Sequence, residues 1–421
     1  MSQELPQNVD IRGAMAILAV ARRLGVSSGL DDLLDLIINE TIAVLNCDRA
    51  SLFLYDPQRG ELYSKIARGL GVIRIPFDCG IAGLCARELK IINVPDAYAD
   101  PRFNPHVDRD SGYRTRNILS CPLIDHDGKL VGVLQAINKQ RGDFTRADEW
   151  LLETLSSQAG VALQRARLIE QYAEKQRLER ELDLAREIQE GLLPKREPEL
   201  KGYQIVGWNR PAEKTGGDCY DFIPLDADRV GVLLADASGH GIAPALVVSQ
   251  LRAMVRVLLL GAAMEQAQVI RRVNQILCED LPADRFITAF CGVIDTEHHE
   301  LRYCSAGQGP ILHVKPAQQT VKQFSATCCP LGILDELEFH LDQPINFDKG
   351  DVLLLVTDGF YEWANAKGEQ FGIERLKKVA LELADLAATD IIARILEELT
   401  RFAGGTGQED DLTAIVIKRI G

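Results

Sequence analysis

The spacing of apolar and polar positions changes along the chain and predicts three parts. In the first part, leucines and isoleucines between positions 30 and 38 recur three and four residues apart, as on one face of a helix that covers about 11–47. Apolar-rich runs at 50–55, 61–67, 118–123 and 130–138 predict strands, and the turn residues at 56–60 and 126–128 predict hairpins. Residues 80–83 (GIAG) open another helix, and 144–163 predict a last one.

A long polar connection interrupts this first part at residues 96–117. Loops of that length are uncommon inside compact domains and usually serve a function. We therefore expect this segment to contribute to a binding site.

From about 163 to 193 the chain is charged and rich in helix formers, with no glycine before Gly191. One heptad seam through this segment contains Val161, Leu168, Leu178, Leu182, Ala185 and Leu192. Polar residues fill its other positions, so it predicts a weak coiled coil, and hence a parallel homodimer. A solvated connecting helix explains the same pattern equally well.

Beyond residue 201 the pattern becomes rich in strands, expected at 203–209, 221–225, 230–235, 289–295, 300–306, 311–314, 352–357 and 412–418. Helices are expected at 243–260, 264–280, 373–384 and 390–402. Strands and helices come in mixed blocks without regular βαβ alternation. This order predicts two packed sheets with helices outside, so the fold class is α+β and multi-domain.

Acidic residues stand at the edges of four strands in this last part. The motifs are GGD (216–218), DASGHG (236–241), TDG (357–359) and EDD (409–411). One such acid is most often a turn former or a helix cap. Four in one domain suggest convergence, and clustered carboxylates repel one another unless cations lie between them. Oxygen ligands without histidine or cysteine partners favour Mg²⁺ or Mn²⁺.

Composition narrows the class of protein. The net charge of −14 over 421 residues argues against a general nucleic-acid or membrane-surface binder. The most apolar segment, 243–260, carries Arg252 and Arg256, so we expect no membrane span. No secretory signal is visible, and the ten cysteines lack CxxC spacing. The expectation is a cytoplasmic protein with reduced thiols.

The first part resembles a GAF domain over about 11–165, through GIAG, DAYADPRFN, GYRTRNILSCPL and GVLQAINK. Asn138, Lys139, Phe144, Asp148 and Glu149 match the signature of GAF domains that bind cyclic nucleotides. In that signature a Lys139–Asp148 pair braces the pocket without touching the ligand. The alternative is a small dimerising or protein-binding GAF domain with an empty pocket.

The GAF resemblance implies a pocket for cyclic AMP or cyclic GMP. The positions that family members use fall here on Ser51, Ala67, Arg68, Ile81, Ala82, Asn104, Asp108, Ser111, Thr115 and Gln135. A guanidinium such as that of Arg68 suits a cyclic phosphate. A solvated arginine at a strand end is an equally good interpretation.

Residues 189–419 resemble the protein phosphatase 2C superfamily, closest to the bacterial branch typified by the sporulation stage II E protein. The matching strings include IQEGLLP, RPAEKTGGDCYDF, LLADASGHGIAPALVVSQLRAMVR, FITAFCGVID, GDVLLLVTDGFYEW and DDLTAIVI. The resemblance implies an α-β-β-α sandwich and two Mn²⁺ or Mg²⁺ ions. Its metal ligands carry over to Asp218, Asp236, the carbonyl of Ala237, Asp358 and Asp410, with Asp411 beside them and Thr413 bracing the turn.

The reaction implied is hydrolysis of phosphoserine or phosphothreonine by a water that two metal ions activate. The eukaryotic branch has a histidine two residues after the bridging acid, where this chain has Ser238. Protonation of the leaving group by His240, or by metal-bound water, is therefore a hypothesis, and a hydrogen-bonded turn residue is the alternative interpretation of His240. Lys214 and Arg210 are candidates for holding the phosphate, and the helix at 243–257 resembles a switch that completes the metal site.

The domains expected are a GAF sensor at 1–165, a signalling helix at 166–195 and a phosphatase at 196–421. By resemblance, the substrate is a phosphoserine protein of the anti-sigma-factor antagonist type. The alternative function is a ligand-sensing dimeric scaffold with an inactive phosphatase domain. A nucleotidyl cyclase or kinase is disfavoured, because no phosphate-cradling glycine loop or Walker lysine is evident.

Overall fold

The computed structural model describes residues 22–23, 29–64, 73–77, 79–261, 264–282 and 284–421. The chain divides into two compact units, Met1–Arg177 and Leu178–Gly421. Predictions for residues 11–21, 24–28 and 65–72, including those for Ala67 and Arg68, lie outside the described residues.

The first unit contains a six-stranded antiparallel sheet in the order β3-β2-β1-β6-β5-β4. Its strands are β1 (Cys47–Asp56), β2 (Glu61–Ser64), β3 (Ile73–Pro76), β4 (Ile92–Val94), β5 (Ile118–Ile124) and β6 (Leu130–Lys139). Its helices are α2 (Leu30–Leu45), α3 (Gly80–Glu88), α4 (His106–Ser111) and the start of α5 (Arg146–Leu192). The expected antiparallel sheet with flanking helices is confirmed.

Helix α2 and the start of α5 cover one face of this sheet with a shared apolar core. Ile37, at the centre of α2, is fully buried in that core. Lys139 at the end of β6 extends its Nζ to within 2.6 Å of Asp148 Oδ1 in α5 and donates to the Leu45 carbonyl at 2.7 Å. One ammonium group thus ties both helices to the sheet, and the tie to α5 is the pair that the motif predicts.

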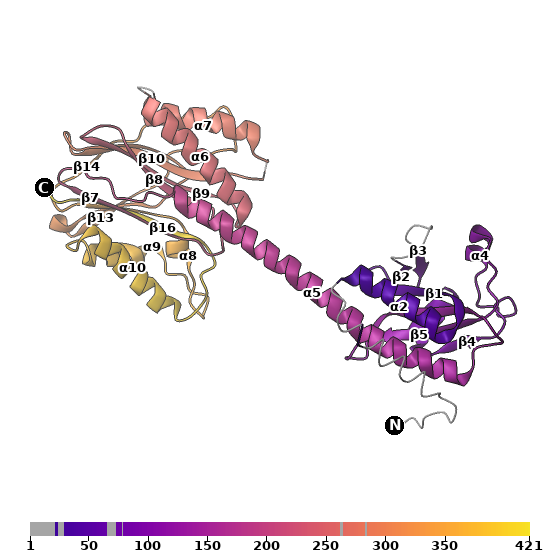
Figure 1. The fold of residues 1–421 in the computed structure, drawn as a ribbon. Helices are drawn as coiled ribbons and strands as arrows, with labels where there is room; N and C mark the ends of the chain where they lie inside the picture. Colours follow the sequence, from indigo (N-terminus) through magenta and orange to yellow (C-terminus); the bar gives the residue numbers. More distant parts are fainter. Residues whose placement is uncertain (1–21, 24–28, 65–72, 78, 262–263, 283) are drawn as a thin grey trace. The chain divides into compact units, whose positions relative to one another are not determined.

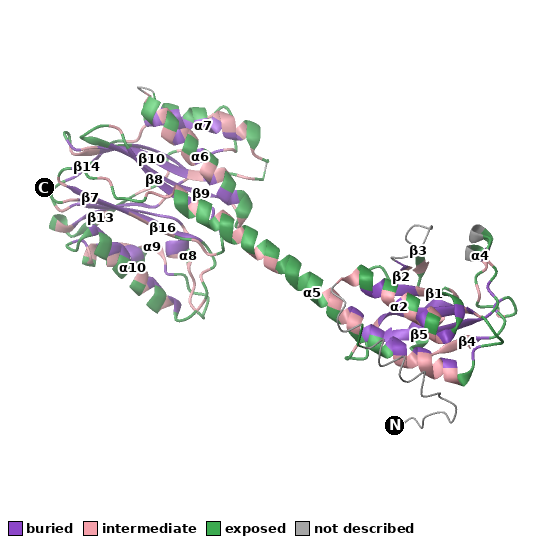
Figure 2. Cartoon of the chain, in the orientation of Figure 1, coloured by how far each residue is buried: buried purple, intermediate pink, exposed green. Residues whose placement is uncertain are grey.

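Helix α5 continues without interruption through the segment expected to link the domains. One side of its first turns is buried, whereas the middle of the helix is almost entirely exposed (Figure 2). Leu168 and Leu178 of the heptad seam are 56% and 52% exposed. Part of the heptad seam is therefore exposed to solvent.

The second unit contains two five-stranded sheets, ordered β14-β11-β10-β9-β8 and β13-β12-β15-β16-β7. The first is built from β8 (Asp218–Pro224), β9 (Arg229–Ala237), β10 (Ile287–Asp295), β11 (Glu300–Ala306) and β14 (Ile345–Asn346). The second is built from β7 (Tyr203–Arg210), β12 (Ile311–Lys315), β13 (Thr320–Phe324), β15 (Val352–Val356) and β16 (Leu412–Arg419).

Four layers result (Figure 1). Helices α6 (Ile242–Gly261) and α7 (Gln266–Asp280) pack on the first sheet. Helices α9 (Ile373–Glu382) and α10 (Ala388–Ala403) pack on the second, and a third core lies between the sheets. The inner strands β9, β10, β12, β15 and β16 are buried along almost their whole length, because helices cover one face of each sheet and the other sheet covers the second face. The expected α-β-β-α sandwich is confirmed.

The apolar pattern missed the shortest elements. Helix α4 lies inside the connection that was expected to be a loop, and α8 (Gly359–Glu362) directly follows an acid motif. Strands β13 and β14 also escaped, because β13 is a mostly exposed edge strand and β14 has two residues. Edge strands carry little of the alternation on which sequence predictions depend.

Helix α6 is the one helix among the described residues that is long and apolar enough to cross a membrane. Its buried side chains, including Val248, Leu251 and Val255, belong to the core under the first sheet. Arg256 donates two hydrogen bonds to Asp221 of β8, at 2.9 and 2.7 Å, and Arg252 Nε lies 3.1 Å from the same carboxylate. Packing of α6 on the first sheet therefore accounts for its apolar side chains.

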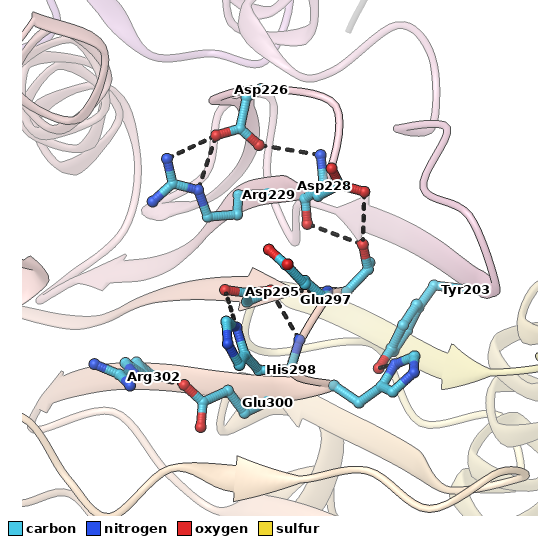
Figure 3. A network of polar contacts seen from close by, with 11 residues as sticks. Tyr203, Asp226, Asp228, Arg229, Asp295, Glu297, His298, Glu300 and Arg302 are labelled. Atoms are coloured by element: carbon cyan, nitrogen blue, oxygen red, sulfur yellow. Dashed lines mark hydrogen bonds and ion pairs between the residues drawn. The ribbon is translucent and has the colours of Figure 1, made fainter.

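A polar network occupies the turns at one end of the first sheet (Figure 3). Arg229 donates to Asp226 at 2.8 Å, and His298 lies 3.0 Å from Asp295. In the β9–β10 ladder Arg229 is opposite Asp295, whereas Asp236 is opposite Thr288 near the other end of these strands. The network therefore closes turns at the end of the sheet remote from Asp236.

Candidate metal centre and ligand pocket

Asp218 and Asp236 lie side by side at one end of the first sheet. They are directly opposite each other in the β8–β9 ladder, with Asp218 buried and Asp236 partly so. Adjacent strands place opposite residues about 5 Å apart. Ala237, whose carbonyl was predicted as a ligand, follows at the end of β9, and its N–H donates to the Gly217 carbonyl at 3.0 Å.

Two threonines from the second sheet and its strand ends orient Asp218. Thr357 and Thr413 donate their hydroxyl hydrogens to Asp218 Oδ2 at 2.7 and 2.6 Å. Asn209 donates to Thr413 Oγ1 at 2.8 Å and so fixes the direction of that hydroxyl. The carboxylate of one sheet is thereby held by side chains of the other.

The other acids come from the ends of β15 and β16, which are neighbours in the second sheet. Asp358 follows β15 and stands just before α8, and Asp410 and Asp411 precede β16. Gly359 allows this proximity, since a Cβ there would lie 2.2 Å from the Asp411 carbonyl oxygen. Antiparallel pairing of β15 with β16 thus brings the TDG and EDD motifs together.

Both carboxylate oxygens of Asp411 accept hydrogen bonds from backbone N–H groups. Its Oδ1 accepts the N–H of Ala212 at 2.7 Å, and its Oδ2 accepts that of Gly217 at 2.6 Å. A Cβ on Gly216 would lie 2.4 Å from Asp411 Oδ2, so this loop requires glycine. These contacts favour a bracing role for Asp411 over direct metal ligation.

Burial and mutual repulsion perturb these acids. Burial and the nearby Asp236 hold the pKa of Asp218 well above its usual value, and its two threonine donors oppose that shift. Burial, with the charges of Asp358 and Asp410, raises the pKa of Asp236 to about 7. Burial, with the charge of Asp410, raises the pKa of Asp358 to about 6.

The charges of Asp358 and Asp410 thus act on Asp236, and carboxylates that repel one another in this way favour a cation between them. The donors are carboxylates and a carbonyl, the ligands that Mg²⁺ and Mn²⁺ prefer. Among the described residues, no three His, Cys, Asp or Glu side chains are already arranged as a group that could hold a metal ion. The donor set therefore fits a divalent ion in its chemistry.

The basic candidates have other partners. Lys214 forms an ion pair with Asp183, and Arg210 donates to Gln408 at 2.7 Å. His240 is 82% exposed, with Nδ1 3.1 Å from Glu213 Oε1. Sequence reasoning missed Arg285, whose Nη1 donates to the Ser238 carbonyl at 2.7 Å and so supports the turn after Asp236.

The first unit contains a cavity of about 760 Å³ beside β1, α3 and α4. Of the predicted ligand-binding residues, seven line it: Ser51, Ile81, Ala82, Asn104, Asp108, Thr115 and Gln135. Ala67 and Arg68 lie outside the described residues, as does the side chain of Ser111. The volume is in the range of pockets for small organic ligands.

Internal hydrogen bonds already engage part of this lining. Asp108 accepts the N–H and hydroxyl of Thr115, both at 2.7 Å, and the Tyr98 hydroxyl at 3.0 Å. Gln135 Nε2 donates to Ser120 Oγ at 2.8 Å. Asp108, Thr115 and Tyr98 all belong to the long connection at 96–117. The hydrogen bonds of Asp108 therefore hold this connection together beside the pocket.

Two arginines that sequence reasoning missed also line the cavity. Arg49 precedes Ser51 by two positions on β1, and its guanidinium lies 3.8 Å from the centre of the Tyr113 ring. Alternation along a strand could have identified it, because residues two apart share a face. Arg74 lies on β3, a short strand that the pattern did not predict.

Comparison with known families matches both units. Residues 29–163 match the GAF domain, and residues 226–420 match the stage II sporulation protein E (SpoIIE) family. The chain combines a GAF domain with a SpoIIE-type phosphatase 2C domain. This arrangement agrees with the two resemblances in the sequence.

Relatives divide in the same way. A probable 3′,5′-cyclic phosphodiesterase, pde-5 of Caenorhabditis elegans, is 35% identical over 153 residues, which are 33% of this chain and 21% of that protein. The phosphoserine phosphatase RsbU of Bacillus subtilis is 27% identical over 247 residues, which are 58% of this chain and 71% of RsbU. The match thus spans only a fifth of the phosphodiesterase.

Among solved structures, the SiaA-PP2C domain of Pseudomonas aeruginosa superposes with a TM-score of 0.51 at 20% identity. The match covers 58% of this chain and 98% of that domain. At this identity it supports the fold of the SpoIIE-type domain and nothing finer.

Proposed function

We propose that the chain is a metal-dependent protein phosphatase that hydrolyses phosphoserine or phosphothreonine and is regulated through its GAF domain. The observation that carries this proposal is the convergence of Asp218, Asp236, Asp358 and Asp410 from strand ends of two sheets. Such crowded carboxylates are expected to bind cations, since burial and repulsion disfavour their charged forms.

In this proposal Asp218, Asp236, the Ala237 carbonyl, Asp358 and Asp410 hold two Mn²⁺ or Mg²⁺ ions. The ions, when bound, supply an activated water and neutralise phosphate charge. The threonines fix the orientation of Asp218, and Asp411 fixes the loop before it. His240, at the exposed turn after Asp236, is the proposed proton donor to the leaving oxygen.

Hydrolysis of p-nitrophenyl phosphate with and without Mn²⁺ tests this function. Asp236→Asn and Asp358→Asn are expected to lose nearly all Mn²⁺-dependent turnover. Asp226→Asn is the matched control, because Asp226 belongs to the turn network at the other end of the sheet. Equal turnover in all four proteins, or none in the wild type, favours the alternative function of a ligand-sensing scaffold.

The substrate class is proposed from the relation to RsbU, whose name describes a phosphoserine phosphatase. We propose a phosphoserine protein, of the anti-sigma-factor antagonist type. Release of phosphate from a phosphoserine peptide, compared with a phosphotyrosine peptide of the same sequence, tests the class. Preference for the phosphotyrosine peptide would contradict it.

The regulatory ligand is proposed from the cavity and from the relation of the GAF domain to a cyclic phosphodiesterase. A cyclic nucleotide fits the volume, and Arg49 and Arg74 supply positive charge in the lining. The exposed Leu168 and Leu178 of α5 support a parallel homodimer through the linker helix and GAF domain. A cytoplasmic location goes with this proposal.

A further inference from the structure

The end of helix α5 holds the loop that leads to Asp218. We name residues 211–217 the Asp218 loop. The Gln189 side chain donates from Nε2 to the Gly216 carbonyl at 2.6 Å and accepts the Gly216 N–H on Oε1 at 3.1 Å. One side-chain amide thus satisfies both polar groups of one glycine residue.

The same loop is held on its other side by Asp411. The Asp411 carboxylate accepts the N–H groups of Ala212 and Gly217, and the Gly217 carbonyl accepts the N–H of Ala237. The loop therefore lies between α5 and the start of β16, without strand pairing of its own. Two of the proposed metal ligands adjoin this loop. Asp218 follows it directly in the chain, and Ala237 donates its N–H to the Gly217 carbonyl.

We propose that Gln189 is a positioning residue for the metal centre, and that α5 acts on the centre through it. The inference deepens the proposed function and rests on it. The Gln189 amide holds the Asp218 loop on one side and the Asp411 carboxylate holds it on the other. The loop therefore keeps Asp218 in place before any ion binds. Misplacement of a ligand by about an ångström is enough to weaken a site strongly.

The geometry makes this contact sensitive to the helix. The two hydrogen bonds require the Gln189 amide to lie edge-on to Gly216, and each residue along a helix turns its side chain by about 100°. A rotation or shift of α5 therefore breaks both bonds. The first turns of the same helix carry Leu152, Leu155 and Leu163, which are core residues of the GAF domain.

A second contact of α5 with this loop joins Asp183 and Lys214, and both side chains are about half exposed. Exposed ion pairs contribute little. Gln189 is half-buried and bonds to the backbone itself, so of these two contacts it is the one that we expect to fix the loop.

The test uses the full chain and measures Mn²⁺ binding by isothermal titration beside p-nitrophenyl phosphate turnover. Gln189→Ala is expected to weaken Mn²⁺ binding about tenfold or more, as loss of a contact that supports metal ligands does. Its kcat is expected to recover in part at saturating Mn²⁺. Gln189→Glu keeps the size but places an acceptor against the Gly216 carbonyl, so it is expected to weaken binding as well.

Glu187→Ala is the matched control, because Glu187 is exposed on the same helix two residues earlier. It is expected to bind Mn²⁺ and turn over substrate like the wild type, with the melting temperatures of the metal-free proteins equal. Wild-type Mn²⁺ affinity in either Gln189 variant would overturn this inference and leave the proposed function intact. A wild type without Mn²⁺ binding and turnover would overturn both, and one that binds Mn²⁺ without turnover would overturn the function alone.

Discussion

Asp218 and Thr413 are 195 positions apart in the chain, and the Thr413 hydroxyl donates to Asp218 Oδ2 at 2.6 Å. Thr357 donates to the same oxygen at 2.7 Å. Since both bonds reach one oxygen, they fix the plane of a carboxylate whose strand belongs to the opposite sheet. The strand-end acid is thus oriented by the packing of the two sheets.

Removing the Thr413 hydroxyl is expected to weaken metal binding at the proposed centre. Thr413→Val keeps the shape of the side chain but deletes the donor to Asp218, and it leaves Asn209 without an acceptor. We expect Mn²⁺ affinity to fall about tenfold, as for other contacts that orient metal ligands. Titration calorimetry measures this, and Thr413→Ser, which keeps the hydroxyl, should stay within about threefold of wild type.

Filling the GAF cavity is expected to abolish ligand binding. Ser51→Phe places a ring in the cavity from the centre of β1, whereas Gln58→Phe places it on the exposed β1–β2 turn. Cyclic AMP or cyclic GMP should raise the melting temperature of the wild type and of Gln58→Phe, but not of Ser51→Phe. No shift for the wild type with either nucleotide removes the cyclic-nucleotide proposal.

The proposed role of His240 depends on the leaving group. His240→Ala is expected to lower kcat about a hundredfold for a phosphoserine peptide, whose alkoxide needs a proton. The effect on p-nitrophenyl phosphate should be small, because p-nitrophenolate leaves without one. Equal effects on the two substrates, or an unchanged pH–rate profile for the peptide, would assign protonation to another donor.

The buried carboxylate of Asp221 is expected to stabilise the contact between α6 and β8. Asp221 is 1% exposed and faces Arg252 and Arg256. Asp221→Asn leaves two cations without their counter-charge, so we expect unfolding to become easier by about 2–3 kcal/mol. Urea unfolding of the second unit measures this, with the exposed pair in Asp226→Asn as the control that should change by less than about 1 kcal/mol.

His313 makes the stability of the second unit depend on pH. Burial, and the charges of Lys315 and Lys322, lower its pKa despite the nearby Asp351. The folded state therefore keeps the imidazole neutral at a pH where the unfolded chain takes up a proton. Stability is fully present above about pH 6.5 and falls as the pH drops below it, by at most about 1.4 kcal/mol per pH unit.

Unfolding curves between pH 5 and 7.5 test this dependence. His313→Asn, which does not titrate, should show a shallower fall in this window than the wild type. An identical slope in both proteins would mean that other groups account for the acid sensitivity.

Much of the fold followed from local pattern. Strands such as β9 and β16 contain apolar runs of four residues (VLLA and AIVI), and helices such as α6 repeat their apolar positions every three or four residues. Elements without such repeats were missed, since α4 and β13 are short and largely polar. The contact of Lys139 with Asp148 was predicted because both residues belong to the signature that resembles GAF domains.

The sequence by itself determined which chemistry is present: strand-end acids beside glycines in one part, and a pocket motif in the other. Only the tertiary structure decided that Asp411 bonds to backbone N–H groups, that Thr357 and Thr413 share one oxygen of Asp218, and that Gln189 pairs with Gly216. The physical reason is the separation along the chain of the residues that interact. Periodicity records contacts within one element, whereas each of these bonds joins segments that meet only when two sheets and a helix pack together.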